Sequence, residues 1–480
     1  MIKRLFAIGI ALSLTACETR PDTFMPTAQA AAPKFRSVII RNVPHVRQKP
    51  DFCGEACAEM VLRRHGLSLD QDDVFGLTGV NPALGRGAYT AELVKALRKL
   101  GFDVGRVWFE IQKKQAKKAL GVQFAALHRD LRAGIPSVVC TRYDERPDTT
   151  EHFRLILGYD AAKDEVIYHE PALPKAAYRR MKRSRLLSLW PLKYKRDRWT
   201  VIRIRLDGKK LKTPAIARGA FKAADFAQHV RRLRSKLPDG FHVVIQPPFV
   251  VIGNEPAATV RARARSTVKW AVDRLKRAYF RRDPKKILDI WLFKDRRTYL
   301  YYAKKLFSDR PSTPYGYYSS QNGALVMNIA TGGGTLVHEI VHPFVEANFE
   351  NCPAWFNEGL GSLYEQSASR RGEIVGLTNW RLAGLQNALR AGSVPSFKKM
   401  LSTTTNQFYS ADPGTNYAQA RYLLYYLQEK GKLRRYYHTF YKNRIRDPTG
   451  YRSLKKILGE RDMTAFFRKW KTYTLKLRYR

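Results

Sequence analysis

Apolar and polar positions in the first part of the chain follow patterns that predict helices first and strands afterwards. Apolar residues at helical spacing predict a helix over residues 53–64, which ends at the pair His65–Gly66, and another over about 90–100, which ends at Gly101. Runs rich in β-branched and aromatic residues then predict strands in IPSVVCTRY, FRLILGYD, EVIYHE and WTVIRIRLD. This order of elements indicates an α+β fold.

The pattern changes in the second part of the chain, which becomes mostly helical. Short apolar runs predict strands in HVVIQ, FVVIG, ILDIWLF and ALVMNIA, and a long amphipathic stretch predicts a helix over about 257–278. From Thr335 to the C-terminus the spacing of apolar residues is helical, apart from a predicted loop around 402–415. The chain contains no internal repeat.

Segments without either period divide the chain into domains. A chain of 480 residues is longer than one hydrophobic core usually serves, so more than one domain is expected. Residues 18–36 are rich in Pro and Ala and predict a flexible tether, and residues 208–220 are basic with Gly, Pro and Ala and predict a linker. We therefore expect a first domain over 37–207 and a second over 221–480.

The first 17 residues, MIKRLFAIGIALSLTAC, are typical of a bacterial lipoprotein signal peptide. Two cations precede an apolar run that is too short to span a membrane permanently, and small residues follow up to Cys17. LTAC resembles the lipobox, which implies that Cys17 is lipidated after cleavage and anchors the exported chain in the cell envelope. Glu18 is not the aspartate linked to inner-membrane retention, which favours the outer membrane. An ordinary signal peptide with a chance cysteine is the alternative.

The charge of the chain favours anionic partners. Lys and Arg number 87 against 41 Asp and Glu, which gives a formal net charge of +46 at pH 7. At a membrane anchor this charge favours an anionic lipid or polymer, and the sequence has no signature of a specific nucleic-acid binder. A solvated basic face is the alternative interpretation of the densest basic patch. That patch comprises Arg179, Arg180, Lys182, Arg183, Arg185, Lys193, Lys195, Arg196 and Arg198.

The stretch GTLVHEIVHPF carries the strongest chemical signal. On a helix, residues four apart lie one turn above each other, so His338 and His342 can direct imidazole nitrogens at one metal ion. Glu339 is rotated by about 100° from its neighbour and can face a water molecule instead. Downstream, PAWFNEGLGSLYEQ offers Glu358 on a second helix as a third ligand. The alternative is a pair of packed core histidines and a carboxylate at a helix start.

These segments together resemble the gluzincin zinc metallopeptidases, over about residues 221–475. The resemblance implies a zincin-like, mostly helical domain in which His338, His342 and Glu358 bind zinc and Glu339 activates the water. It also implies that PYGYYSSQNGALVMNIA contains an edge strand that pairs with an extended substrate. Such enzymes often use a tyrosine to donate to the oxyanion. Tyr417 is a candidate for this role, although a helical core tyrosine is the simpler interpretation.

A second candidate centre lies in QKPDFCGEAC. Cys53 falls at the N-terminus of a predicted helix, where free N–H groups and the helix dipole favour a thiolate. A nucleophilic cysteine needs a base, and EHFRLILGYD places His152 at the head of a strand. The Gln48 amide can donate to an oxyanion and Glu170 can orient the imidazole, but sequence spacing does not set these distances.

The segments VPHVRQKPDFCGEACAEMVLRRHG, GIPSVVC, EHFRLILGYD and VIYHEPA resemble the papain-like peptidase family that includes the bacteriocin leader-processing enzymes, over about residues 43–205. The resemblance implies that Cys53 is the nucleophile, His152 the base and Gln48 a support for the oxyanion. The third position of the family usually holds an aspartate before proline, whereas this chain has Glu170 before Pro171. A papain-like domain that binds without cleaving is the alternative.

Taken together, these patterns predict an exported, lipid-anchored peptidase that uses zinc to hydrolyse a peptide or protein substrate. The papain-like domain would cleave, bind or regulate its neighbour. Cys57, Cys140 and Cys352 match neither a zinc ribbon nor a disulfide scaffold, and pairing among them stays open. The alternative function is a non-catalytic lipoprotein that binds the envelope through its basic surface and keeps the peptidase folds as scaffolds.

Overall fold

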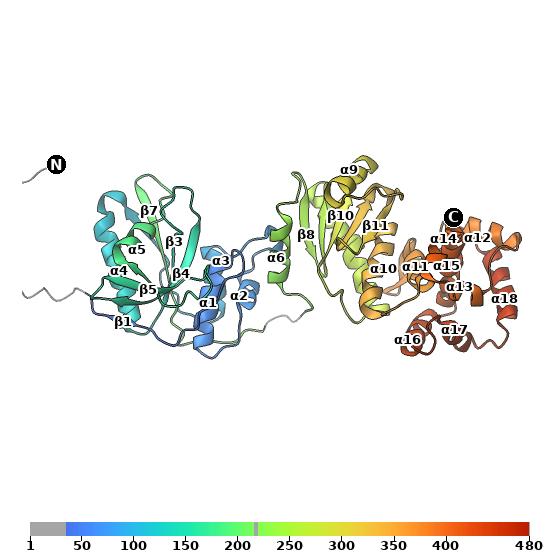
Figure 1. Cartoon of the computed structure of the whole chain (residues 1–480), viewed down its shortest axis with the longest axis horizontal. Helices are drawn as coiled ribbons and strands as arrows, with labels where there is room; N and C mark the ends of the chain where they lie inside the picture. Colours follow the sequence, from blue (N-terminus) through green and yellow to red (C-terminus); the bar gives the residue numbers. More distant parts are fainter. Residues whose placement is uncertain (1–34, 216–218, 480) are drawn as a thin grey trace, which may run out of the picture.

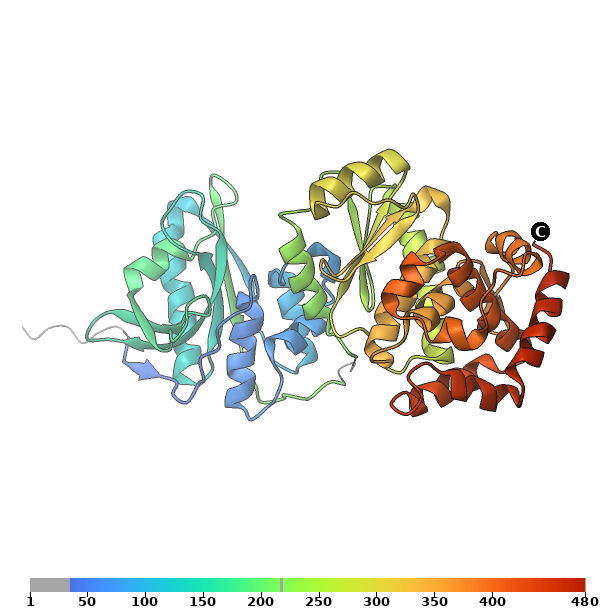
Figure 2. The same ribbon diagram turned by 45° about the vertical axis from the view of Figure 1, so that its right-hand side comes forward.

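Three regions follow one another along the molecule in the computed structural model, which describes residues 35–215 and 219–479 (Figures 1 and 2). An α/β region is followed by a smaller sheet region and then by a helical region at the C-terminus. The predicted signal peptide, the lipidation site Cys17 and nearly all of the tether lie outside the described residues. Within those residues, no helix has the length and apolarity needed to cross a membrane.

The first region is built on an antiparallel sheet with the strand order β2-β7-β3-β4-β5-β6, and β1 pairs with β4. Its strands are β1 (Val38–Ile39), β2 (Trp108–Gln112), β3 (Ser137–Arg142), β4 (Glu151–Asp160), β5 (Glu165–His169), β6 (Arg179–Lys182) and β7 (Arg198–Arg205). Its helices are α1 (Cys53–Arg64), α2 (Gln71–Thr78), α3 (Thr90–Lys99), α4 (Ala116–Arg132) and α5 (Arg183–Leu189), with short 3-10 segments η1 (Pro82–Leu84) and η2 (Lys113–Gln115). This mixed architecture agrees with the α+β prediction for the first region.

Helix α6 (Ala223–Leu233) packs against both the first region and the sheet region that follows. Ala224 and Ala227 belong to the apolar core of the first region, whereas Phe226 and Val230 belong to the core of the second sheet. Lys222, just before the helix, lies 3.0 Å from Asp70 and 2.8 Å from Asp73. The two regions are therefore joined by a shared helix as well as by the chain itself.

The second sheet is mixed, with the strand order β11-β12-β10-β9-β8. β9 (Phe249–Gly253), β10 (Leu288–Phe293) and β12 (Ala324–Asn328) are parallel, and β8 (His242–Gln246) and β11 (Gly316–Ser319) are antiparallel edge strands. The long helix predicted over 257–278 is continuous but changes type, from α7 (Ala257–Arg263) through the π-helical η3 (Ala264–Lys269) to α8 (Trp270–Ala278). Helix α9 (Arg296–Phe307) and the short η4 (Ile329–Thr331) complete this region.

The C-terminal region is helical, but two details of the prediction were wrong. A hairpin of β13 (Ser367–Arg370) and β14 (Glu373–Gly376) interrupts the helices. The predicted loop around 402–415 contains α14 (Thr405–Ser410), because Thr404 and Gln407 form a capping box, and Asp412 caps the next helix. The helices are α10 (Gly334–Asn348), α11 (Ala354–Tyr364), α12 (Arg381–Arg390), α13 (Phe397–Leu401), α14, α15 (Pro413–Glu429), α16 (Leu433–Asn443), α17 (Tyr451–Leu458) and α18 (Met463–Lys476).

Candidate active sites

Close packing of α10 against α11 brings the HEIVH motif and Glu358 to one place. Gly361 on α11 lies directly against the His338 ring, where a Cβ would come within 3.1–3.2 Å of three ring atoms. At the start of α10, a Cβ on Gly334 would lie 2.0 Å from the carbonyl oxygen of Glu365. Glycine at both positions therefore allows the two helices to approach each other.

The structure brings together His338, Glu339, His342 and Glu358, which we call the histidine centre. His338 Nε2 lies 3.1 Å from Glu358 Oε2, and His342 Nε2 lies 3.9 Å from Glu358 Oε1. Glu339 Oε2 is 3.8 Å from His342 Nε2, and the ligand atoms of the three motif residues all lie within 4.8 Å of one another. All four side chains are buried or half-buried.

Each imidazole of the histidine centre is held through its other nitrogen. His342 Nδ1 donates to the Asn357 side-chain oxygen at 3.0 Å, and His338 Nδ1 lies 3.2 Å from Glu365 Oε1. Glu365 in turn accepts two hydrogen bonds from Arg381, at 2.9 and 2.8 Å. This donor set suits a zinc ion, since two imidazoles and a carboxylate converge and both rings are fixed by oxygen partners. Sequence reasoning missed Glu365, although it falls two helical turns after Glu358.

The carboxylates shape the electrostatics of the histidine centre. Burial opposes protonation of His338, but Glu358 and Glu365 outweigh it and raise the pKa of the imidazole. Burial also raises the pKa of Glu339, against the two neighbouring imidazoles. For Glu358 burial is outweighed by His342 and His338, which lower its pKa to about 2. The centre is therefore a buried cluster of carboxylates that attracts a cation.

The Tyr409 hydroxyl contacts the histidine centre, and Tyr417, the candidate oxyanion donor, lies beside it as a helical tyrosine packed against the core, which was the simpler interpretation. The Tyr409 hydroxyl donates to Glu358 Oε1 at 2.6 Å from α14. Tyr417, on α15, lies next to it, with 6.3 Å between the two ring centroids. Burial and the nearby Glu358 carboxylate raise the pKa of both phenols. Tyr409 was missed because its segment was predicted to be a loop.

The second candidate centre comprises Gln48, Cys53, His152 and Glu170, which we call the cysteine centre. Cys53 is the first residue of α1, His152 is the second residue of β4, and Glu170 directly follows β5. His152 Nε2 is hydrogen-bonded to Glu170 Oε1, as expected for an orienting carboxylate. The backbone N–H of Gln48 donates to Pro171 O at 2.9 Å, which places Gln48 beside the same turn.

A buried arginine that the sequence reading missed completes the cysteine centre. Arg154 Nε donates to Glu170 Oε2 at 2.8 Å, and its Nη2 donates to the backbone oxygen of Tyr143 at 2.8 Å. Arg154 and Glu170 are only 4% and 3% exposed, so the pair is shielded from solvent. His152 and Arg154 are two apart on β4 and share one face of the strand, which was the available signal.

Burial shifts the pKa of the Cys53 thiol in the direction opposite to the one expected at a helix N-terminus. Burial raises the pKa of Cys53 to about 12, although the backbone N–H of Phe153 opposes this shift. Burial lowers the pKa of His152, while Glu170 opposes that shift, so the imidazole is neutral at neutral pH and suited to act as a base. Among the described residues, no hydrogen bond joins the Cys53 thiol to His152 or to Gln48.

The four cysteines that the structure describes are free thiols, which answers the open question about their pairing. Cys57 is buried one turn along α1 from Cys53, and its sulfur lies 3.9 Å from the backbone oxygen of Phe153. Cys140 is also buried, and Cys352 is half-buried. Cys53 is therefore not blocked by a disulfide.

Five of the nine cations in the densest basic patch form local ion pairs. These pairs are Arg180–Asp160 (2.6 Å), Lys182–Glu165 (3.3 Å), Arg183–Asp164 (2.7 Å), Arg185–Glu145 (2.7 Å) and Arg198–Glu110 (3.4 Å). This partial pairing is typical of a solvated face.

Comparison with known proteins bears on the first region. The model of the Peptidase_C39 like family matches residues 40–196. The crystal structure of the peptidase domain of Streptococcus ComA, a bi-functional ABC transporter involved in a quorum-sensing pathway, is similar at 17% identity and a TM-score of 0.22. That match covers 34% of this chain and 98% of the ComA chain. No curated protein matches the chain.

The family match supports the papain-like prediction for the first region and a peptide as the class of substrate. It ends before residue 221, so the metallopeptidase prediction for the second domain rests on the residues of that domain.

Proposed function

We propose that this chain is an envelope-anchored peptidase whose second domain, of the gluzincin type, hydrolyses peptide bonds with zinc held by His338, His342 and Glu358. The observation that carries the proposal is the convergence of the three side chains, with Glu358 oxygens 3.1 and 3.9 Å from the two Nε2 atoms. The anchor would be lipidated Cys17 in an exported chain, with the outer membrane favoured.

The reaction follows from the positions of the chain's own residues. Zinc in this donor set would polarise a substrate carbonyl and lower the pKa of a water molecule. Glu339, buried beside His342, accepts the proton of the attacking water and then delivers it to the leaving amine. Its raised pKa suits both tasks, because a base of moderate strength also releases its proton. Tyr409 steadies the Glu358 carboxylate.

An extended substrate would lie along β11, the edge strand of the second sheet. β11 pairs only with β12 among the described strands, so its outer backbone groups are free to bind another chain. Helix α10 packs near this strand, and the Tyr318 hydroxyl donates to Glu346 Oε2 at 3.3 Å. The substrate would thus run past the histidine centre in a defined register.

For the first domain we propose Cys53 as nucleophile, His152 as base, Glu170 as the orienting carboxylate and Gln48 as oxyanion donor. The His152–Glu170 hydrogen bond and the neutral imidazole support this assignment. A binding role without cleavage is the second candidate, and the raised pKa of the Cys53 thiol favours it.

Metal content and single substitutions test the proposal. We expect about one zinc per purified chain, lost in His338→Ala and kept in the matched control His438→Ala, because His438 is exposed and remote. Glu339→Gln should keep the metal and lower kcat/KM for peptide hydrolysis by about 10²–10⁴-fold, as expected for loss of a general base. Zinc bound equally well by His338→Ala, or hydrolysis undiminished in Glu339→Gln, would contradict the proposal.

A further inference from the structure

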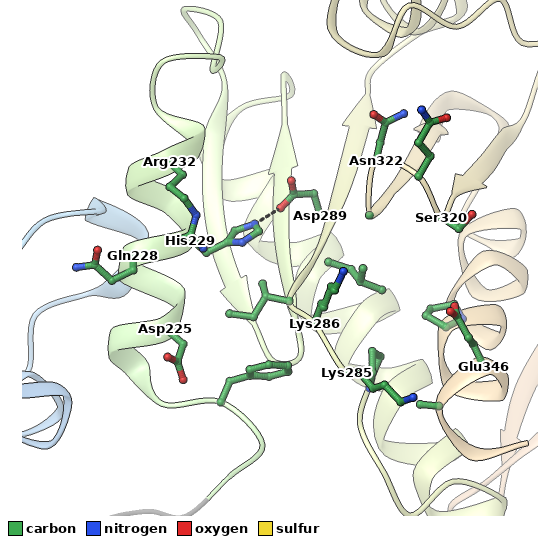
Figure 3. A pocket seen from close by; sticks show the side chains of 18 of the residues that line it. Asp225, Gln228, His229, Arg232, Lys285, Lys286, Asp289, Ser320, Asn322 and Glu346 are labelled. Atoms are coloured by element: carbon green, nitrogen blue, oxygen red, sulfur yellow. Dashed lines mark hydrogen bonds and ion pairs between the residues drawn. The ribbon is translucent and has the colours of Figure 1, made fainter. Parts of the chain in front are cut away.

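The cavity between the first region and the second sheet has balanced charges. Figure 3 shows this space of about 950 Å³, with α6 on one side and the β11–β12 turn and α10 on the other. Two of its cations pair with acids of the first region, and the other three are matched in number by carboxylates of the lining. These are Arg232, Lys285 and Lys286 against Asp225, Asp289 and Glu346. An excess of one charge lies instead in the C-terminal helices.

The last three helices, α16 to α18, carry an excess of positive charge. From the start of α16 to residue 479 the chain has 14 Lys and Arg and three acids, an excess of 11 within a chain of net charge +46. Acids on neighbouring elements reduce this excess only slightly. Glu373 of the β13–β14 hairpin pairs with Arg434 at 2.6 Å, and Glu350 follows Phe349, whose ring packs against Tyr441. Even when both are counted, nine cations have no acid to balance them.

A pocket of about 500 Å³ on α17 concentrates these charges. Its cations are Arg452, Lys455, Lys456 and Arg461, and its one acid is Glu460. Glu460 lies 2.9 Å from Lys469, which is a further cation outside the lining. The four lining cations form no ion pair with another described residue. The pocket therefore stays positive even when the charge of Glu460 is counted.

A second pocket, of about 400 Å³, lies between α16 and the turn that follows α8. Arg281, Arg282 and His438 line it with three tyrosines and Asn348, and none of the described residues in the lining carries a carboxylate. The Asn348 side-chain oxygen accepts from the backbone N–H groups of Arg281 and Arg282 at 3.0 and 2.9 Å, which holds this turn in place. The pocket therefore offers two guanidinium groups without a competing acid.

The turn between α16 and α17 presents an apolar side chain to water. Ile445 is 86% exposed, more than any other large apolar side chain among the described residues. Arg444 and Arg446 flank it, and neither forms an ion pair with another described residue. The turn is held by buried Asp447, which accepts from the backbone N–H of Ser453 at 2.7 Å. An exposed apolar residue between cations is typical of a segment that enters the interface of an anionic membrane.

We propose that α16, α17 and the turn between them bind the anionic surface of a lipid bilayer, an inference that rests on the proposed envelope location and not on the histidine centre. The two helices lie side by side at one edge of the helical region (Figures 1 and 2). Lipid phosphates would meet the cations of the two pockets, and Ile445 would enter the layer of acyl chains. A soluble polyanion fits less well, because it would leave Ile445 in water.

Binding to lipid vesicles tests this surface. Full-length chains that carry Cys17→Ser, and so lack the lipidation site, are mixed with vesicles of phosphatidylcholine alone or with about 30% phosphatidylglycerol, and flotation measures the bound fraction. The anionic vesicles should be bound at least about 100-fold more tightly, because each cation near such a surface contributes about fivefold. Lys455→Gln together with Lys456→Gln should weaken this binding by about 10–30-fold.

The matched control is Lys117→Gln with Lys118→Gln, an exposed adjacent pair on α4 at the opposite end of the molecule (Figure 1). It should weaken vesicle binding less than about threefold. Equal weakening by both lysine pairs would overturn the inference, since net charge alone would then explain the affinity. Ile445→Ser leaves the charge unchanged and should weaken binding about tenfold, as expected for an inserted apolar side chain. Undiminished binding in Ile445→Ser would identify a soluble polyanion as the ligand and overturn the membrane assignment.

Mass spectrometry of the wild-type chain from cells separates this inference from the proposed anchor. Lipidated Cys17, combined with no preference of the Cys17→Ser chain for anionic vesicles, would overturn the surface and leave the anchor standing. Unmodified Cys17, combined with vesicle binding that depends on Lys455, Lys456 and Ile445, would support the surface and count against the anchor.

Discussion

The histidine centre draws its side chains from two successive helices, and 20 residues separate His338 from Glu358. The cysteine centre instead gathers a loop, a helix start and two strand ends, and 99 residues separate Cys53 from His152. Their electrostatics differ as well. The histidine centre is a cluster of carboxylates that attracts a cation, whereas burial holds the Cys53 thiol in its neutral form.

This difference suggests that neighbouring side chains orient the histidine centre, whereas the cysteine centre depends on activation of its thiol. The imidazoles of the histidine centre contact Glu365 and Asn357 through their other nitrogens. The cysteine centre has a base ordered by Glu170 but a thiol whose pKa is raised by burial, so the proposed attack by Cys53 would require proton transfer to His152. The following experiments test this contrast.

The largest expected effect is the pH dependence of Cys53. With a pKa of about 12, the thiol is protonated below that pH and its thiolate fraction rises with pH. The rate of alkylation by iodoacetamide at Cys53 should therefore rise about tenfold per pH unit, or about 10³-fold from pH 7 to 10. Site-resolved mass spectrometry measures the rate, with buried Cys57 as the internal control. An alkylation rate that stops rising by pH 8 would show that Cys53 has a low pKa, and the two centres would then not differ in this respect.

Removing the buried guanidinium should break the cysteine centre without touching the histidine centre. Arg154→Met leaves the Glu170 carboxylate buried without its guanidinium partner, and should destabilise the first region by about 3–5 kcal/mol. Denaturant unfolding measures the loss, while zinc affinity should stay unchanged. Arg179→Met, an exposed position on β6, is the control and should change stability by no more than about 0.5 kcal/mol. A similar cost for both variants would mean that Arg154 is not specifically required.

Gly361→Ala tests whether helix packing positions His338. The added methyl group would press on three ring atoms of His338 and should lower zinc affinity by about 10–100-fold, as expected for a strained ligand. Gly384→Ala makes the same chemical change on α12, where a Cβ meets nothing within 4 Å, and should leave the affinity intact. Competition with a chromogenic chelator measures both. Unchanged affinity in Gly361→Ala would show that the ring has room to move.

The smallest effect separates the two tyrosines near Glu358. Tyr409→Phe removes a hydrogen bond to a carboxylate and should lower kcat/KM by about tenfold. Tyr417→Phe keeps that bond and should change kcat/KM less than about twofold. Steady-state kinetics at equal zinc loading distinguishes the variants, and a larger loss from Tyr417→Phe would favour Tyr417 as the oxyanion donor.

Sequence reasoning reached the histidine motif because helical periodicity is local. His338 and His342 share a face whatever the rest of the chain does. Sequence reasoning did not identify Tyr409, because it overlooked the capping box of α14. Helix α4 was also missed, although Leu120, Phe124, Leu127 and Leu131 recur at helical spacing.

The cysteine centre depends instead on strand register, which the sequence alone does not specify. β4 and β5 pair Leu155 with His169, so the next positions along the two strands bring Arg154 beside Glu170. The motifs named the residue types of this centre, but the register of the β4–β5 pair was needed to place its buried arginine beside Glu170.

Helix α6 has a practical consequence for anyone who wishes to study the two halves apart. A fragment that stops at residue 207 would lack Ala224 and Ala227. The apolar surface of the first region that these residues cover would then be exposed to water. A fragment that starts after Leu233 would strip Phe226 and Val230 from the sheet. Either fragment should be less stable and expose apolar surface, so the two halves are best produced as a single polypeptide.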